Sequence, residues 1–195
     1  MDGIVVIAAS AGGLGPLRSI IAALPAPCTT AVFVVMHSGP YPSILPDLLG
    51  RAGVLPAALA RDGDKIEVGH IYVAPPDHHM VLGFDSIRLN QGPKVHYTRP
   101  AADPLFISAA ETHGKRVKGV VLSGGNSDGA AGLRAIAEHG GTALVQDPKE
   151  AAMPYMPRAA IAADHPDARL KVEEIAKRIR SFCAGGTVVQ RRSQQ

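Results

Sequence analysis

The sequence predicts a doubly wound α/β fold, with a mostly parallel sheet, helices on both faces and a short antiparallel elaboration at one edge. Hydrophobic residues make up 46% of the 195 residues and charged residues only 19%, which excludes disorder for most of the chain. Aromatic residues are 4% and Trp is absent, so the core must be built from Ala, Val, Ile and Leu, the residues typical of buried parallel strands. Apolar runs alternate with segments of helical periodicity, the order expected of βαβ units.

The N-terminal part predicts strand, helix, strand and helix in turn. Residues 3–8 form a continuous apolar run with β-branched residues, which indicates a strand buried on both faces. Residues 15–24 place apolar side chains at i, i+3, i+4 and i+7 behind a Gly-Pro start and before a proline, as in an amphipathic helix. Residues 31–36 predict a second inner strand, and Ser43 can cap a short helix that ends near Leu49.

The middle of the chain, from about residue 54 to residue 95, predicts short strands at the edge of the sheet, some of them antiparallel. Turn residues separate four short apolar stretches. These stretches are residues 55–59, 71–74, 80–82 and 87–89.

Regular alternation returns after residue 100. Asp103-Pro104 predicts an N-cap and a helix start, and Gly114 ends that helix. The remaining predicted elements are an inner strand at 117–122, a helix at 130–139, a strand at 142–145 and an amphipathic helix at 172–182. We therefore expect one domain over residues 1–185 and a disordered tail at 186–195.

Charge and cysteine content exclude several function classes. The net charge is +3, but Arg191 and Arg192 in the tail supply two of these charges, so nucleic-acid binding is not expected. Cys28 and Cys183 are the only cysteines and cannot form a disulfide framework, which favours a reducing, cytoplasmic setting. Because no apolar stretch approaches the roughly 20 residues of a membrane span, membrane insertion is not expected.

Three reactive side chains follow predicted parallel strands. Ser10 follows the first strand, His37 the second, and Asp128 lies in the loop after residue 122. Because the carboxyl ends of parallel strands share one edge of the sheet, these side chains should meet there. A hydroxyl, an imidazole and a carboxylate are the parts of a nucleophilic triad, and the first N–H groups of the helix after Gly13 could bind an oxyanion.

Each of these residues also has a structural interpretation. Ser10 could be a helix cap or part of a phosphate loop, His37 a loop histidine, and Asp128 the N-cap of the helix that follows it. A nucleotide or phosphate at the first helix N-terminus is an alternative, although the segment matches neither G-x-G-x-x-G nor a P-loop. His78 and His79 lack further ligands at metal-binding spacing, so we interpret them as surface histidines and expect no metal and no cofactor.

Several ordered motifs resemble the catalytic domain of the chemotaxis-type protein-glutamate methylesterases, the CheB family. The resemblance runs from about Ile4 to about Ile161. Its segments are Val6-Ile7-Ala8-Ala9-Ser10-Ala11-Gly12-Gly13, Val34-Val35-Met36-His37, Ile71-Tyr72-Val73-Ala74-Pro75-Pro76-Asp77-His78-His79, Arg99-Pro100-Ala101-Ala102-Asp103-Pro104-Leu105-Phe106, Val120-Val121-Leu122-Ser123-Gly124 with Asp128-Gly129-Ala130-Ala131-Gly132, and Val145-Gln146-Asp147-Pro148 with Met156-Pro157.

The resemblance implies a serine hydrolase that demethylates glutamate methyl esters, and deamidates glutamines, on chemoreceptor-like proteins. The family nucleophile falls on Ser10, its histidine on His37 and its aspartate on Asp128. For the oxyanion we assign the backbone N–H groups of Ala11 and Gly125. The partner implied is a methylated chemoreceptor or a similar signalling protein, and we expect a monomer or weak oligomer.

The sequence departs from the family pattern at positions next to these residues. Ala8 and Ala11 replace the usual Gly and Thr around the nucleophile, and Gly124-Gly125-Asn126-Ser127 replaces the usual Gly-Met-Gly-x before the aspartate. The first strand begins near Ile4 without a preceding receiver domain, so a phosphorelay switch within the same chain is not expected. The alternative function is a catalytically weak or inactive homologue that acts as a protein-binding module.

Overall fold

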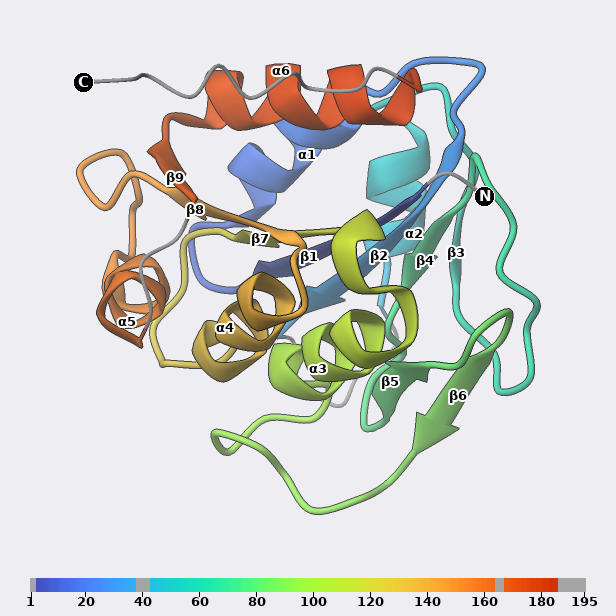
Figure 1. Cartoon of the computed structure of the whole chain (residues 1–195), viewed down its shortest axis with the longest axis horizontal. Helices are drawn as coiled ribbons and strands as arrows, with labels where there is room; N and C mark the ends of the chain where they lie inside the picture. Colours follow the sequence, from blue (N-terminus) through green and yellow to red (C-terminus); the bar gives the residue numbers. More distant parts are fainter. Residues whose placement is uncertain (1–2, 38–42, 164–166, 186–195) are drawn as a thin grey trace.

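The computed structural model describes residues 3–37, 43–163 and 167–185, and they form one seven-stranded parallel sheet covered by helices on both faces (Figure 1). The strand order is β3-β4-β2-β1-β7-β8-β9. The strands are β1 (Gly3–Ala9), β2 (Thr30–Met36), β3 (Ala57–Leu59), β4 (Ile71–Val73), β7 (Val117–Val121), β8 (Thr142–Gln146) and β9 (Ala168–Leu170).

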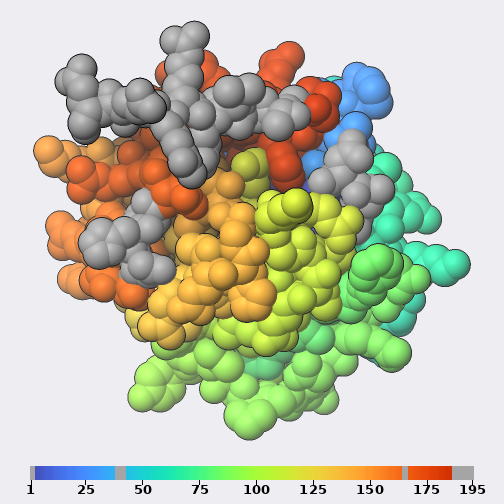
Figure 2. Space-filling view, in the orientation of Figure 1, coloured from blue at the N-terminus to red at the C-terminus, as the bar shows by residue number. Residues whose placement is uncertain are grey.

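The helices divide between the two faces of the sheet. The first face carries α1 (Leu14–Ala22), α2 (Leu45–Gly50) and α6 (Val172–Cys183). The opposite face carries α3 (Ala102–His113), α4 (Ala130–Glu138) and α5 (Tyr155–Ala163), and a 3-10 turn, η1 (Gly114–Arg116), connects α3 to β7. In the space-filling view, α3 and α4 close over this face of the sheet (Figure 2).

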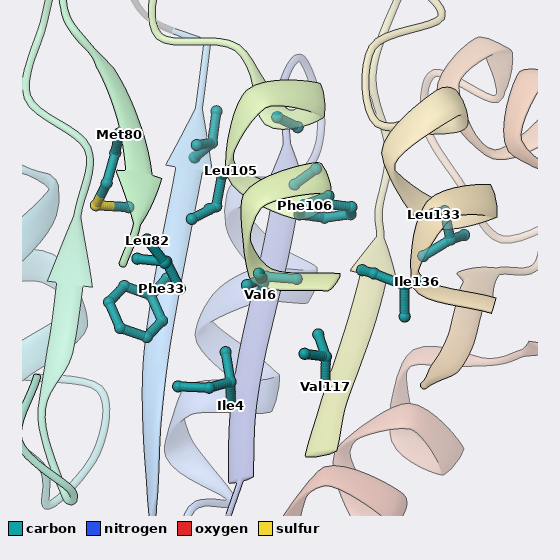
Figure 3. Close-up of a cluster of buried hydrophobic side chains, with 14 of the residues drawn as sticks. Ile4, Val6, Phe33, Met80, Leu82, Leu105, Phe106, Val117, Leu133 and Ile136 are labelled. Carbon is teal, nitrogen blue, oxygen red and sulfur yellow. The ribbon is translucent and has the colours of Figure 1, made fainter. Parts of the chain in front are cut away.

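The core consists of two apolar layers because the central strands are buried on both faces. All seven residues of β1 are buried, so alternate side chains enter opposite layers. Phe106 of α3 packs against the layer that contains Val6 and Phe33 (Figure 3), and the ring of Phe33 stacks on Tyr72 at 5.2 Å between centroids. This packing fixes β1 and β2, whose carboxyl ends carry the candidate site.

The doubly wound fold predicted from the sequence is confirmed. The middle segment divides between two sheets: β3 and β4 extend the main sheet in parallel, while β5 (His79–Leu82) and β6 (Ile87–Asn90) pair with each other in antiparallel orientation. The β5–β6 hairpin packs against α3 (Figure 1). Cys28 and Cys183 are both buried free thiols.

Some local predictions differ from the structure. Asp103 is not the N-cap of α3, because the helix begins at Ala102 after the extended residue Ala101, and Asp103 lies in its first turn. The elements α5 and β9 were not predicted. Residues 186–195 lie outside the described residues, so the predicted tail, and with it the domain boundary at 185, stays a prediction.

Candidate active site

The candidate site lies where the strand order changes direction. On one side of β1 the chain forms β2, then the edge strand β3, and then β4 between them, and it afterwards crosses to the other side of β1 to form β7. The helices that follow β1 and β7 lie on opposite faces of the sheet. Such a switch point separates the loops at the carboxyl ends of the two strands and leaves a crevice for ligands.

Ser10 and His37 occupy equivalent places at the ends of neighbouring strands. Ala9 of β1 is paired with Met36 of β2, so the next residue in each strand is Ser10 and His37. The N–H of His37 donates to the carbonyl of Ala9 at 3.1 Å, which continues the ladder to the last residue of β1. The sheet register therefore places residues 10 and 37 side by side at the carboxyl edge of the sheet.

His37 and Asp128 form a short, shielded pair. His37 Nε2 lies 2.7 Å from Asp128 Oδ2, with 9% and 0% of the two side chains exposed. A carboxylate accepts hydrogen bonds only, so Nε2 carries the proton and Nδ1 presents its lone pair. Thr98 Oγ1 lies 3.5 Å from the same Nε2. The imidazole is thus fixed in one tautomer, with Nδ1 as its basic nitrogen.

Asp128 caps a helix other than its own. Its carboxylate accepts hydrogen bonds from the N–H groups of Ala102, at 2.5 Å, and Asp103, at 3.0 Å, in the first turn of α3. The interpretation of Asp128 as the N-cap of α4 is wrong, because Gly129, with φ +87°, occupies that position without a side-chain cap. The N-terminal end of α3, where the helix dipole is positive, therefore stabilises the negative charge that pairs with His37.

The pKa of Asp128 reflects a balance between burial and hydrogen bonding. Burial is the largest influence and by itself raises the pKa of this carboxyl. The hydrogen bonds from His37 and from the N–H groups of Ala102 and Asp103 together outweigh it, so the pKa of Asp128 is lowered from its ordinary value. Asp128 is consequently ionised at neutral pH, as a group that orients an imidazole must be.

The backbone around Ser10 is held by close packing between loops. The N–H of Ser10 donates to the carbonyl of Ser123, and its own carbonyl accepts from Gly13, both at 2.9 Å. A Cβ on Gly124 would lie 2.9 Å from Ser10 Cβ and 1.9 Å from Met156 Sδ, so only glycine fits there. Ser10 Oγ makes no hydrogen bond to any residue that the structure describes, which leaves the hydroxyl able to rotate.

Ser123 ties three loops together and was not singled out by the sequence analysis. Its hydroxyl donates to the carbonyl of Ala11 at 2.8 Å and accepts from the N–H of Met153 at 2.9 Å. Its N–H donates to the side-chain oxygen of Gln146. Ser123 lies two residues after the end of β7, and Ser10 lies directly after β1. The position of Ser123 near the carboxyl end of an inner strand is therefore a sequence signal that could have identified it.

The two proposed oxyanion donors lie in exposed loops. Ala11 and Gly125 are both exposed, and neither N–H donates to another residue within the described ranges. Ser123 and Met153 connect the two loops, since Ser123 bonds to both Ala11 and Met153, and a Cβ on Gly125 would lie 3.9 Å from Met153 Cε. These N–H groups are therefore available to a ligand.

The histidines and aspartates near the site are held by hydrogen bonds between protein groups. His96, Asp103 and Asp128 each offer an atom within 4.8 Å of the others, a spacing that could hold a metal ion. However, both oxygens of each carboxylate already accept a hydrogen bond from an imidazole or a backbone N–H. These protein hydrogen bonds therefore account for the cluster.

The interpretation of His79 as a surface histidine is wrong. Only 3% of His79 is exposed, and its ring bonds to the carbonyl of Pro93 at 3.0 Å and the N–H of Ala101 at 3.3 Å. His78 is half-buried and bonds to the carbonyl of Pro76. His79 thereby joins β5 to the segment that precedes α3.

The segment between β6 and α3 is anchored by Arg99. Its guanidinium donates two hydrogen bonds to Asp77 Oδ1, at 2.7 and 3.0 Å, and two more to the carbonyls of Gln91 and Gly92. The Arg99 side chain lowers the pKa of Asp77 from its ordinary value. This anchor holds Thr98 beside His37.

Comparison with known proteins places the chain in a family. The family model described as CheB methylesterase matches residues 5–179. The chain belongs to the CheB methylesterase family. No described helix has the length and apolar character that a membrane span requires.

Two curated proteins and one solved structure resemble this CheB-family chain over most of its length. A curated protein of Leptospira interrogans is 37% identical over 179 residues, which cover 89% of this chain and 91% of that protein. A protein-glutamate methylesterase/protein-glutamine glutaminase of Caulobacter vibrioides is 41% identical, but the match covers 91% of this chain and 53% of the relative. The crystal structure of the Thermotoga maritima CheB methylesterase catalytic domain matches with a TM-score of 0.89 at 29% identity, over 93% of this chain and 99% of that one.

Proposed function

We propose that this chain hydrolyses glutamate methyl esters on a protein substrate, with Ser10 as nucleophile, His37 as base and Asp128 as the group that orients the base. The observation that carries the proposal is the buried His37–Asp128 pair next to Ser10, at the switch point of a CheB-family fold. Relatives named protein-glutamate methylesterase/protein-glutamine glutaminase support both ester and amide substrates. The enzyme is then a carboxylic ester hydrolase.

The first half of the reaction forms an acyl-enzyme. Ser10 Oγ attacks the ester carbonyl carbon while Nδ1 of His37 takes the hydroxyl proton, and Asp128 stabilises the imidazolium that results. The tetrahedral intermediate collapses as the C–O bond to the methoxy group breaks, and the imidazolium returns its proton to release methanol. Rotation of the unbonded Ser10 hydroxyl toward Nδ1 is the movement required, and contacts of this kind tighten on substrate binding.

The second half regenerates the enzyme. Water attacks the acyl carbon while Nδ1 of His37 takes a proton, and the same proton passes to Ser10 Oγ as the acyl–oxygen bond breaks. The product is the glutamate carboxylate. In both halves the N–H groups of Ala11 and Gly125 are the proposed donors to the oxyanion.

The departures from the family pattern at Ala11 and Gly125 leave these main-chain donors in place. Ala11 lacks a hydroxyl, but its N–H is open to a ligand. Gly125 stands where the family usually has a methionine, and Met153 Cε lies 3.9 Å from the position of a Cβ there. We infer that Met153 supplies from the loop before α5 the apolar thioether that residue 125 lacks.

The substrate proposed is a methylated chemoreceptor or a similar signalling protein, in a cytoplasmic setting. Tyr97 and Met153 are exposed at 96% and 38% and belong to the two loops that border the site. Exposed aromatic and methionine side chains are favoured where a protein partner binds. These side chains, together with an open site, support a macromolecular substrate over a small enclosed one.

The decisive experiment measures methanol release from a methylated receptor preparation. The wild-type chain should release methanol, and Ser10→Ala should lose most of the rate, on the order of 10⁶-fold in comparable triads. Ser19→Ala is the matched control, because Ser19 is exposed on α1 and its hydroxyl donates a hydrogen bond to the carbonyl of Gly15 within the same helix. Wild-type turnover in Ser10→Ala would refute the assignment, whereas binding of the receptor without turnover in any variant would support the alternative of a binding module.

A further inference from the structure

A second serine–histidine–aspartate arrangement lies beside the first. His96 Nε2 is 2.9 Å from Asp103 Oδ2, and His96 Nδ1 is 3.2 Å from Ser127 Oγ. A nucleophile within about 2.6–3.2 Å of a base that is oriented by a third group is the signature of an activated nucleophile. The proposed esterase reaction uses none of these three side chains.

The tautomer of His96 suits it to accept a proton from Ser127. The Asp103 carboxylate only accepts hydrogen bonds, so Nε2 of His96 donates to it and Nδ1 is left as an acceptor for the Ser127 hydroxyl. His37 has the same arrangement, with Nε2 toward Asp128. The two imidazoles therefore present the same nitrogen as base.

Asp103 is a firmly held partner for this imidazole. Its side chain is 6% exposed, and its other oxygen, Oδ1, accepts from the N–H of Gly132 at 2.7 Å. Burial, as the largest influence, and the neighbouring charge of Asp128 raise the pKa of Asp103, against the hydrogen bonds from Gly132 and His96. Because Oδ1 of Asp103 is occupied by the N–H of Gly132, Oδ2 is the oxygen that orients His96.

The backbone at His96 is held in an unfavourable conformation. Val95 and Thr98 exchange two backbone hydrogen bonds, at 3.1 and 2.9 Å, around a two-residue turn. Both turn residues, His96 (φ +49°) and Tyr97 (φ +64°), have left-handed backbone conformations although neither is glycine. Asn-Gly is the preferred pair in a two-residue turn of this kind. Left-handed backbone costs about 1–2 kcal/mol for each such residue. The hydrogen bonds of the His96 imidazole to Asp103 and Ser127 offset this cost and hold the ring in place.

Access to this second group is open. Ser127 is exposed in the loop between β7 and α4. The His96 side chain is 36% exposed and belongs to the segment between β6 and α3, which projects below α3 in Figure 1. The N–H of Ser127 donates to no other residue in the described part of the chain. It is therefore free to donate to the oxyanion that forms when the Ser127 hydroxyl attacks a substrate. An exposed nucleophile of this kind suits small activated esters and phosphonates.

We propose that Ser127 is a second nucleophilic serine, activated by His96 and Asp103, that reacts with small activated acyl compounds independently of Ser10. Ser127 Oγ attacks the ester carbonyl, Nδ1 of His96 takes its proton, and the leaving alkoxide departs as the alcohol with that proton. Water then attacks the acyl group on Ser127, and the acid product leaves as the serine hydroxyl is restored. A fluorophosphonate stops at the first step, because fluoride leaves and the phosphonyl group stays on Ser127.

The two groups share backbone, which decides the design of the test. Ser127 directly precedes Asp128, and the N–H of Asp103 donates to Asp128 Oδ1. Replacing either aspartate would therefore disturb both sites. Substitutions of the serines and of His96 separate the two, because within the described residues neither serine hydroxyl is hydrogen-bonded to the other group.

The experiment is fluorophosphonate labelling, followed by intact-mass and peptide mass spectrometry of the whole chain. In Ser10→Ala we expect one label per chain, on the peptide that contains Ser127, and in Ser10→Ala/Ser127→Ala none. His96→Asn in the Ser10→Ala background should slow labelling at least about tenfold, because asparagine tolerates the left-handed backbone and so keeps the turn without the imidazole. Melting temperatures of all variants establish that they are folded.

The proposal is overturned if folded Ser10→Ala is unlabelled, if its label lies on another residue, or if His96→Asn leaves the rate unchanged. Failure of the proposed esterase function is a separate result. Labelling of Ser10 and methanol release are both measured in Ser127→Ala, where the second group is absent. If a folded Ser127→Ala protein lost both the labelling of Ser10 and methanol release, Ser127 would serve the Ser10 site. That result would also overturn the proposal that Ser127 acts independently of Ser10.

Discussion

Replacing Asp128 by asparagine tests both the helix cap and the imidazole support, because one carboxylate performs both. Oδ2 accepts from His37 Nε2 and from the N–H of Ala102, and Oδ1 accepts from the N–H of Asp103. An amide offers one acceptor atom, and its nitrogen only donates. The better orientation directs the amide oxygen at His37 and Ala102, and it leaves the buried N–H of Asp103 facing a second donor.

The expected magnitude follows from that one unsatisfied group. A buried backbone donor without an acceptor costs about 1–3 kcal/mol, and in a domain of this length each kcal/mol lowers the melting temperature by about 2–4 °C. The retained hydrogen bond keeps the His37 tautomer, but the negative charge that stabilises the imidazolium is lost. We therefore expect the rate to fall by up to about 10⁴-fold, the loss found where the amide also inverts the tautomer.

Urea unfolding and methanol release measure the two effects on the same protein. Asp85→Asn is the matched control, because Asp85 is exposed in a turn and its side chain accepts no hydrogen bond from the residues described. If Asp128→Asn matched the wild-type chain in unfolding midpoint, the helix-capping argument would be wrong. If it matched in turnover, Asp128 would not support the base.

Three other predictions concern packing, pH and substrate choice. Gly124→Ala should lower the free energy of unfolding by about 1–3 kcal/mol, because the added methyl group overpacks against Met156. Urea unfolding measures this loss beside the control Gly15→Ala, whose added methyl group meets no atom within 4 Å. Equal stability of the two variants would contradict the prediction. The pKa of Asp128 is lowered on folding. Its contribution to stability is therefore fully present above the pKa of the unfolded state, about 3.9, and is lost as the pH falls through the folded pKa. Unfolding measured over a series of pH values should show this loss of stability, and Asp128→Ala should remove that part of the pH dependence. Tyr97→Ala should reduce kcat/KM on methylated receptor by about tenfold, the scale of an aromatic anchor, and leave hydrolysis of p-nitrophenyl acetate unchanged; equal losses on both substrates would exclude a role in protein recognition.

The parts of the fold that could be predicted from the sequence are those with a strong local signal. β1 and β2 are continuous apolar runs because they are buried on both faces, and such runs are recognisable without knowing their neighbours. Since both strands are parallel, their order alone places Ser10 and His37 at one edge. The structure has this arrangement, and it brings Asp128 to His37 as well.

The parts that could not be predicted depend on partners that are distant in the sequence. Asp103 was predicted as a cap because an aspartate before a proline normally is one, whereas the acceptor for the first turn of α3 comes from Asp128, 25 residues later. His79 is buried because Pro93 and Ala101 supply its hydrogen bonds. The helix α5 was missed because it is short and has Pro157 at its third position, and β9 because three residues carry no periodicity.

The strand order has a practical consequence for dissecting the reaction. Ser10 and His37 arrive with β1 and β2, while Asp128 and the first turn of α3 arrive with the half of the chain that follows β6. A break between β6 and α3 would give two fragments, each lacking part of the reactive group. Turnover would then report reassociation of the fragments, and the chain could serve as a complementation sensor for any pair of proteins fused to them.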